Sequence, residues 1–175
     1  KRNLGVLERE SLGISPGDGV FRAFPTDFGK IGIPVCIDLW GQPEAAKQIT
    51  DQGADVIFNI SIFPILRGHW KRGAAVRAFD NFIPVVGVNT AGYNALIGEK
   101  RIHQFGGHSF IVNPPKMLDK YDFNRWFRSF DNVDDWTRFE LDELEQIHLA
   151  ELELNTCRRF RREFWNRFGF QRNVY

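Results

Sequence analysis

The sequence is poor in cysteine, in methionine and in long apolar stretches. Its 175 residues include two cysteines and one methionine. Cys36 and Cys157 are far apart, and neither belongs to a C-x-x-C pair, which argues against a disulfide framework, a zinc site and a dithiol redox centre. No apolar run approaches the ~18 residues of a transmembrane helix, and no signal segment opens the chain. We therefore expect a cytoplasmic protein with no membrane partner, no metal and no cofactor.

The overall composition is that of an ordinary globular protein. The sequence is 43% hydrophobic, 14% aromatic and 26% charged, with 17 phenylalanines and a net charge of +1. This charge gives no general attraction to nucleic acid, so a nucleic-acid partner is not expected. The length suits one domain, residues 1–175, and the first residue is Lys1 rather than methionine. We expect this domain to be part of a longer protein.

The first two thirds of the chain alternate between strand-like and helix-like segments. The predicted strands are 29–38, 54–61, 83–92 and 108–114. The predicted helices are 43–52 and 67–82. Pro34 cannot donate to a strand ladder and predicts an interruption just before Cys36. Such an alternation of strands and helices is typical of an α/β domain.

The last third is less regular. The polar and aromatic segment 116–146 is predicted as a surface excursion. Residues 147–155 alternate apolar and polar positions and predict a half-exposed strand. The remainder, 156–175, is predicted as a C-terminal helix and tail. One apolar stripe of this helix would consist of Phe160, Phe164 and Phe168.

Cys36 lies near the carboxyl end of the first predicted strand, and that position suits a reactive thiol. Ligands of open α/β sheets bind beyond the carboxyl ends of the strands, where loops and backbone N–H groups converge. A cysteine in a strand is more often a small core residue. The position alone leaves both interpretations open.

Several motifs around Cys36 resemble those of one enzyme family. The stretch GKIGIPVCIDLWGQPE, residues 29–44, is similar to the nucleophile segment of the nitrilase superfamily of carbon–nitrogen hydrolases. Further motifs follow in the order of that family: GADVI at 53–57, RAFDN at 77–81, VNTAG at 88–92, GHS at 107–109 with NP at 113–114, and RNVY at 172–175. Together these motifs extend over nearly the whole chain.

The resemblance implies both a fold and a reaction. The implied fold is a four-layer α-β-β-α sandwich, here incomplete at its N-terminus, which commonly forms homodimers. The implied reaction is hydrolysis of a carbon–nitrogen bond in a small amide, carbamoyl compound or nitrile. It proceeds through a thioester-type intermediate on cysteine and releases ammonia or an amine.

The resemblance also implies roles for individual residues. Cys36 matches the nucleophile, and Lys1 stands where the family has its catalytic lysine. Glu8 matches a second acidic residue near the substrate, and Glu10 is the less favoured substitute. The backbone N–H of Ile37 would bind the oxyanion together with Lys1. The general-base glutamate of the family belongs to a segment that precedes this chain.

Three departures from the family pattern bear on structure and substrate. Glu44 follows Cys36 by eight positions rather than the usual seven, and Asp80 replaces the usual glutamate. Leu39 and Trp40 stand where relatives that hydrolyse N-carbamoyl amino acids often carry an arginine, which favours a less anionic substrate. The aromatic residues that could line an apolar substrate pocket are Trp40, Phe63 and Trp70.

Three other interpretations remain open. The first is a Cys/His hydrolase, for which the candidate bases are His69, His103 and His108. The second is a nucleic-acid-binding tail, in which four arginines alternate with aromatic residues, namely Arg158, Arg159, Arg161 and Arg162 with Phe160, Phe164 and Trp165. The third is a catalytically inactive or truncated relative with a structural role, which would expose apolar surface on one face of its sheet.

Overall fold

The fold was analysed in a computed structural model of the whole chain. The structure describes residues 1, 3–5, 7–62, 67–93, 104–114, 137–141, 144–152 and 154–167. Its helices are the short π-type helix η1 (Leu7–Ser11), α1 (Ile37–Trp40), α2 (Pro43–Asp51), α3 (Arg67–Asn81) and α5 (Leu154–Arg167). Its strands are β1 (Ala23–Thr26), β2 (Gly29–Gly32), β3 (Val56–Ser61), β4 (Val85–Asn89), β5 (Ala91–Tyr93), β6 (Gln104–Gly106), β7 (Phe110–Val112) and β8 (Thr137–Glu140).

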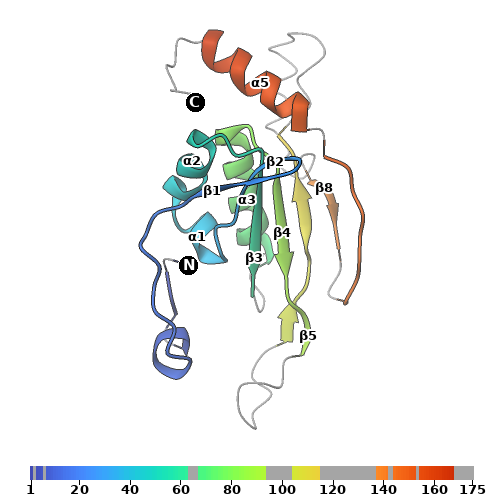
Figure 1. Cartoon of the computed structure of the whole chain (residues 1–175). Helices are drawn as coiled ribbons and strands as arrows, with labels where there is room; N and C mark the ends of the chain where they lie inside the picture. Colours follow the sequence, from blue (N-terminus) through green and yellow to red (C-terminus); the bar gives the residue numbers. More distant parts are fainter. Residues whose placement is uncertain are drawn as a thin grey trace.

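Six strands form the main sheet in the order β1-β2-β3-β4-β7-β8 (Figure 1). The central strands β2, β3 and β4 are parallel, whereas β1, β7 and β8 pair antiparallel with their neighbours. Strands β5 and β6 form a separate two-stranded sheet. Helices α2 and α3 connect the parallel strands, as parallel strands require. The α/β class predicted from the sequence is confirmed, and the four-layer arrangement stays a prediction.

One face of the main sheet packs against helices α2 and α3. Alternate strand residues point to this face, so Ile57 of β3 and Val85 of β4 are fully buried. Helix α2 begins at Pro43, which suits a first helical position. Its residue Ile49 lies so close to β2 that a Cβ atom at Gly32 would overlap it. The glycine therefore allows close packing of the helix on the sheet.

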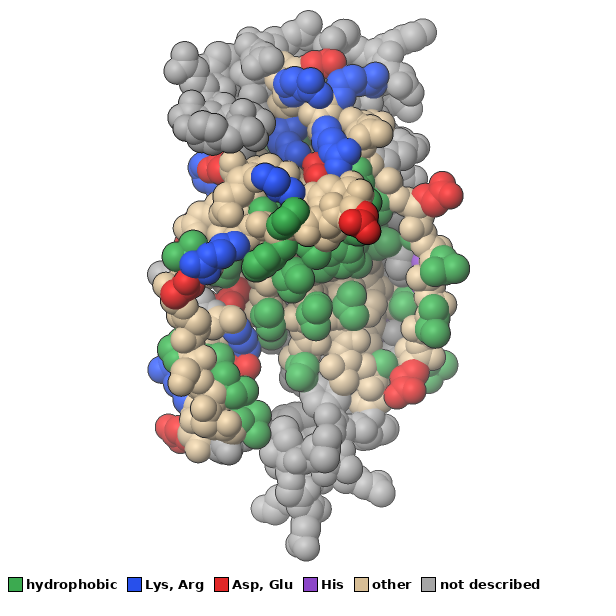
Figure 2. Space-filling model, viewed as in Figure 1, with side chains coloured by type: hydrophobic (Ala, Val, Ile, Leu, Met, Phe, Trp, Pro, Cys, Tyr) green, Lys and Arg blue, Asp and Glu red, His purple; other side chains and the backbone are tan. Residues whose placement is uncertain are grey.

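The opposite face of the sheet carries exposed apolar side chains. Figure 2 shows these side chains gathered over the middle of the sheet. Ile60 is 51% exposed, Val88 is 43% exposed and Ile33 is 39% exposed. No described helix covers this face. An exposed apolar surface of this kind is predicted for a sheet that lacks its covering layer.

Most elements of the first two thirds agree with the sequence prediction. The predicted helices 43–52 and 67–82 correspond to α2 and α3. The strands are shorter than predicted. For example, β2 ends at Gly32, four residues before Cys36, whereas the predicted strand extends to residue 38. The predicted strand 83–92 is divided into β4 and β5, which belong to different sheets.

One prediction for the last third is wrong. Residues 147–152 form no strand, and Ile147 and Leu149 are 96% and 91% exposed, so the alternating pattern does not produce the predicted strand. Most of the predicted surface excursion 116–146 lies outside the described residues and stays a prediction, and its described part includes β8, which pairs with β7 at the edge of the main sheet. The described helices include none that is long and apolar enough to span a bilayer.

Candidate active site

Cys36 lies on a tight turn between β2 and α1. Its backbone has φ 56° and ψ −123°, a conformation that costs a residue other than glycine roughly 1–3 kcal/mol. The Cys36 N–H donates to the carbonyl oxygen of Ile60 at 2.9 Å, which ties the turn to β3. Pro34 is buried in the interruption predicted from the sequence. The protein therefore holds this cysteine in a strained conformation, as is common at functional sites.

The turn is located where ligands bind in open α/β sheets. Strand β3 is parallel to β2 and ends at Ser61. The residue before Ser61 is Ile60, whose carbonyl accepts the Cys36 N–H. Cys36 is half-buried and packs against the edge of the core. Its sulfur is therefore carried by a turn at the carboxyl ends of the parallel strands.

Lys1 and Glu8, both predicted from the family resemblance, form an ion pair. The Lys1 Nζ donates to both carboxylate oxygens of Glu8, at 2.7 and 2.8 Å. The Gly5 N–H also donates to Glu8 Oε2, at 2.7 Å. Burial acts to raise the pKa of Glu8, but these hydrogen bonds and the Lys1 charge outweigh it and lower the pKa. Glu8 is thus held as a carboxylate beside the Lys1 ammonium.

A buried carboxylate ties the Lys1 segment to the Cys36 turn. Asp38 is 1% exposed, and its Oδ1 accepts a hydrogen bond from the Asn3 N–H at 2.9 Å. Asn3 is two residues from Lys1, and Asp38 is two residues from Cys36. The structure therefore brings the Lys1 segment to the same end of the sheet as Cys36.

Behind the turn lies Asn59, which the sequence analysis did not single out. Its Nδ2 donates to the carbonyl oxygens of Pro34 at 2.7 Å and Cys36 at 3.1 Å. The available signal was a polar residue inside an otherwise apolar strand run, VIFNI. Such a residue must find hydrogen-bond partners when it is buried.

The three predicted pocket aromatics have different positions. Trp70 is 1% exposed, packs against Phe110 with the ring planes tilted by 58° and the centroids 4.5 Å apart, and donates its indole N–H to Asn59 Oδ1 at 2.6 Å. Trp40 is half-buried at the end of α1 and packs on α3 at Gly73, where a Cβ atom would lie 2.7 Å from the Trp40 Cβ. Phe63 lies outside the described residues. Trp70 thus supports the turn from behind, and contact of these aromatics with substrate stays a prediction.

The three candidate histidine bases are not gathered into one described cluster. His69 is exposed on α3, and His108 is half-buried between β6 and β7 with φ 53°. His103 lies outside the described residues, so the Cys/His interpretation stays a prediction. Within the described ranges, no group of three or more His, Cys, Asp or Glu side chains could hold a metal ion.

The amino end of β3 carries a different cluster, which the sequence did not predict. Asp55 accepts hydrogen bonds from Arg158 Nε at 2.6 Å and from the Lys30 N–H at 2.9 Å, with Arg161 at 3.8 Å. Gly29 leaves room for this cluster, since a Cβ atom there would overlap Asp55 and Arg158. Burial acts to raise the pKa of Asp55, but the Arg158 and Lys30 hydrogen bonds and the two arginine charges lower it.

This cluster also bears on the predicted nucleic-acid-binding tail. Arg158 is bound to Asp55, and Arg161 additionally donates to the Ala54 carbonyl at 2.8 Å. Two of the four arginines are thus bound to the sheet rather than presented to solvent. The geometry favours a structural role for these two arginines.

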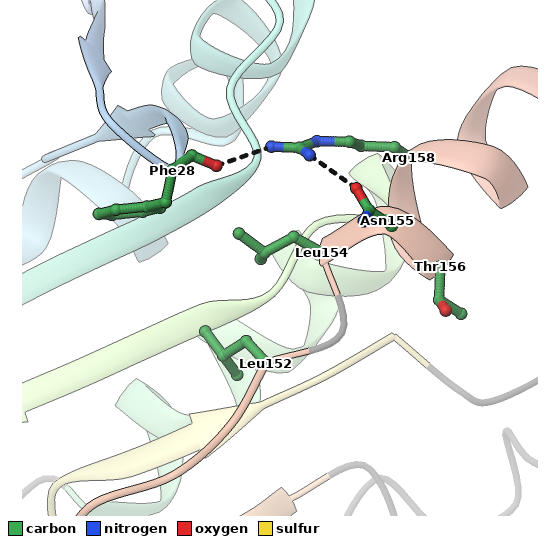
Figure 3. Close-up of a pocket in the computed structure, with 6 residues that line it drawn as sticks. All are labelled: Phe28, Leu152, Leu154, Asn155, Thr156 and Arg158. Carbon is green, nitrogen blue, oxygen red and sulfur yellow. Dashed lines mark hydrogen bonds between the residues drawn. The ribbon is translucent and has the colours of Figure 1, made fainter.

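An open hollow of about 420 Å³ lies beside the cluster (Figure 3). It is lined by Phe28, Leu152, Leu154, Asn155, Thr156 and Arg158. Arg158 crosses its edge and donates to the Phe28 carbonyl at 3.1 Å and to Asn155 Oδ1 at 2.8 Å. The hollow is at the opposite end of β3 from Cys36, so its place gives it no part in thiol chemistry.

Comparison with known proteins agrees with this architecture. The carbon–nitrogen hydrolase family model matches residues 1–115. The N-carbamoylputrescine amidase of Arabidopsis thaliana is 36% identical over 116 residues, which cover 61% of this chain and 38% of the relative. A nitrilase of Pyrococcus abyssi is 32% identical over 113 residues, covering 65% of this chain and 40% of the relative.

A solved structure gives the same fold. The carbon–nitrogen hydrolase from Helicobacter pylori superposes with a TM-score of 0.72 at 22% identity, covering 99% of this chain and 59% of that one. The fold and the turn thus define an α/β domain with a cysteine at the carboxyl ends of its parallel strands. The chain belongs to the carbon–nitrogen hydrolase family. It spans about 40% of the length of the curated relatives that it matches.

Proposed function

We propose that this chain carries the nucleophile of a hydrolase that cleaves a carbon–nitrogen bond in a small amide, carbamoyl compound or nitrile. The main support is the strained Cys36 turn at the carboxyl ends of β2 and β3, together with the Lys1–Glu8 pair tied to the same end of the sheet. A strained backbone at a reactive residue type in this position indicates a nucleophile rather than a core cysteine.

The proposed first step is attack of the Cys36 sulfur on the carbonyl or nitrile carbon. With an amide or carbamoyl compound, a carbon–sulfur bond forms, the carbon–nitrogen bond breaks, and ammonia or an amine leaves with the proton taken from the thiol. With a nitrile, the thiol first adds across the carbon–nitrogen triple bond, and water then converts this adduct to the thioester as ammonia leaves. Water finally hydrolyses the thioester, which releases the acid and restores the thiol. The proton carrier is the family's glutamate, which the resemblance assigns to a segment that precedes Lys1.

The proposal assigns the binding of the oxyanion to two groups, the Ile37 N–H and the Lys1 ammonium. Ile37 is the first residue of α1, and the first N–H groups of a helix have no acceptor within the helix. An ammonium has three N–H donors, and Lys1 uses two of them on Glu8. The third is then available to a tetrahedral oxyanion, for which each such donor is worth about 3 kcal/mol of barrier.

The proposed substrate is neutral or cationic rather than anionic. Leu39 is buried and Trp40 is half-buried in α1, so neither position supplies the arginine that would bind a carboxylate. One relative is named for N-carbamoylputrescine, whose free amine is protonated at neutral pH. We also propose a homodimer, as the resemblance implies, and a cytoplasmic location, as expected from the sequence.

The direct test is a substrate panel with product and adduct analysis. The full-length protein is incubated with N-carbamoylputrescine, an N-carbamoyl amino acid, simple aliphatic amides and a nitrile, while ammonia is measured and acyl groups on Cys36 are sought by mass spectrometry. We expect adducts and ammonia from the cationic and neutral compounds, lost in Cys36→Ala and kept in the matched control Cys157→Ser. Ammonia release that is unchanged in Cys36→Ala, with no adduct on Cys36, would contradict the proposal, and the absence of ammonia from every compound would favour an inactive relative.

A further inference from the structure

The side chain of Asn59 is a fully buried amide in contact with the Cys36 turn. It is 0% exposed within β3. Its Nδ2 donates to the carbonyls of Pro34 and Cys36, and its Oδ1 accepts from Trp70 Nε1 at 2.6 Å and from Ser61 Oγ at 3.1 Å. An amide offers two donors and two acceptor positions, so every hydrogen-bonding position of this side chain is used.

These partners fix the orientation of the amide. The indole N–H of Trp70 can only donate, so it must face the Asn59 oxygen. The two backbone carbonyls can only accept, so they must face the Asn59 nitrogen. No other residue type of this size provides two donors on one side and two acceptors on the other. The site therefore requires asparagine rather than aspartate or leucine.

The bonds of Asn59 hold the strained part of the turn on both sides. Its Nδ2 contacts the carbonyls of Pro34 and Cys36, while the next residue, Ile60, accepts from the Cys36 N–H at 2.9 Å. Two consecutive residues of β3 thus bind three backbone groups at and next to the cysteine. A free chain would relax from φ 56°, so these bonds offset the cost of the strained conformation.

We propose that Asn59 is the positioning residue that holds the Cys36 turn, and that Trp70 and Ser61 lock its amide in place. Asn59 acts through the backbone and touches no substrate. It keeps the sulfur at the carboxyl ends of the strands, because rotation of the turn would carry the thiol away from that position. Its effect on turnover rests on the proposed function, whereas its effect on thiol reactivity does not.

The test measures the alkylation rate of each cysteine by iodoacetamide between about pH 6 and pH 9, read by mass spectrometry of the Cys36 and Cys157 peptides. Asn59→Asp replaces an N–H₂ group by an oxygen that faces two carbonyl oxygens, so it opens the turn with almost no change in volume. We expect Cys36 to react slower by on the order of 10- to 100-fold, because the Pro34 and Cys36 carbonyls lose their donor and the turn leaves the conformation that presents the thiol. The Cys157 rate should be unchanged in the same sample.

The matched control is Asn81→Ala. Asn81 is also buried, 3% exposed, and its side chain donates to the Arg77 carbonyl at 3.0 Å, at the end of α3. We expect this change to lower stability without altering the Cys36 rate or its dependence on pH. If Asn59→Asp fails to fold, Trp70→Phe, which removes the donor to the Asn59 oxygen together with part of the ring, should slow Cys36 by about threefold in the folded protein.

The outcomes separate this inference from the proposed function. Slower Cys36 alkylation in the Asn59 or Trp70 variant supports positioning even where the parent chain hydrolyses no compound of the panel. An unchanged or faster Cys36 rate in these folded variants, or an equal slowing in Asn81→Ala, would overturn the inference. In an active parent, Asn59→Asp should lower kcat with little change in KM, because Asn59 does not contact substrate.

Discussion

The two ends of strand β3 carry polar clusters of opposite kinds. At its amino end, Asp55 is a charged group held by Arg158 and Arg161. At its carboxyl end, Asn59 is a neutral amide whose bonds hold the strained Cys36 turn. The ion cluster joins distant elements of the fold, whereas the amide cluster holds a cysteine in an unfavourable conformation. With the proposed function, stability and chemistry would be assigned to separate ends of one strand.

The largest expected effect is at the carboxyl end. Cys36→Ala removes the proposed nucleophile and should lower hydrolysis by on the order of a thousandfold or more. Ammonia release with the best compound of the panel measures this loss. Stability should change little, because the side chain is half-buried at the edge of the core. A Cys36→Ala variant that keeps most of its activity would contradict a catalytic role for the carboxyl end of β3.

The next largest effect is expected on stability, from a change at the amino end of β3. Asp55→Asn removes a charge at nearly constant volume and leaves two arginines beside an uncharged group. We expect the free energy of unfolding to fall by about 2–3 kcal/mol, below the loss for a fully buried pair because the Arg158 side chain is 33% exposed. Urea unfolding measures this change, and the Cys36 alkylation rate should stay constant.

The control for this change is Asp80→Asn. Asp80 pairs with Arg77 at 3.5 Å, but its side chain is 50% exposed. The free energy of unfolding should therefore change by no more than about 0.5 kcal/mol. Equal losses of unfolding free energy in Asp55→Asn and Asp80→Asn would show that the Asp55 cluster stabilises the fold no more than an exposed ion pair does.

A smaller effect is expected from acid. The pKa of Asp55 is lower in the folded chain than its ordinary value of 3.8, so the folded state binds this proton less tightly than the unfolded state does. The contribution to stability is present above pH 3.8 and is lost as the pH falls through 3.8 toward the lowered pKa. Urea unfolding at a series of pH values should show that the difference in the free energy of unfolding between the parent and Asp55→Asn becomes smaller in this range. A difference that does not change with pH would argue against the ion pair as its cause.

The smallest effect concerns backbone strain at the carboxyl end. Glycine adopts φ 56° without the penalty of other residues, so Cys36→Gly should be more stable than Cys36→Ala by about 0.5–1 kcal/mol. Thermal unfolding compares the two variants. At the exposed position Lys47 of helix α2, the same comparison should have the opposite sign, with glycine about 1 kcal/mol less stable than alanine. A difference of the same sign at both positions would mean that the turn stores no strain.

The sequence predicted local features better than distant ones. Helix α2 could be located because Pro43 and Gly53 mark its ends and its apolar residues have helical spacing. The strand predicted at 147–155 was wrong because alternation shows which side chains could face a core but not whether a partner strand is present. The short β1 and the separate β5–β6 pair were missed for a similar reason, since strand pairing depends on residues outside the segment.

The candidate site was predictable in part. The position of Cys36 at a strand end followed from the pattern, and the motifs suggested Lys1 and Glu8, which the structure pairs. The bonds of Asn59 and the contact of Asp55 with Arg158 could not be predicted. They depend on side-chain orientation and on a separation of 103 residues, which local patterns do not encode.

That long separation has a consequence for the order of folding. The residues that hold the Cys36 turn through Asn59 lie between residues 34 and 70, so these contacts close comparatively short loops. The Asp55–Arg158 contact must close a loop of more than a hundred residues, which is entropically more costly and slower. During synthesis, the thiol-bearing turn can therefore form before α5 emerges, and docking of α5 completes the fold as a late step.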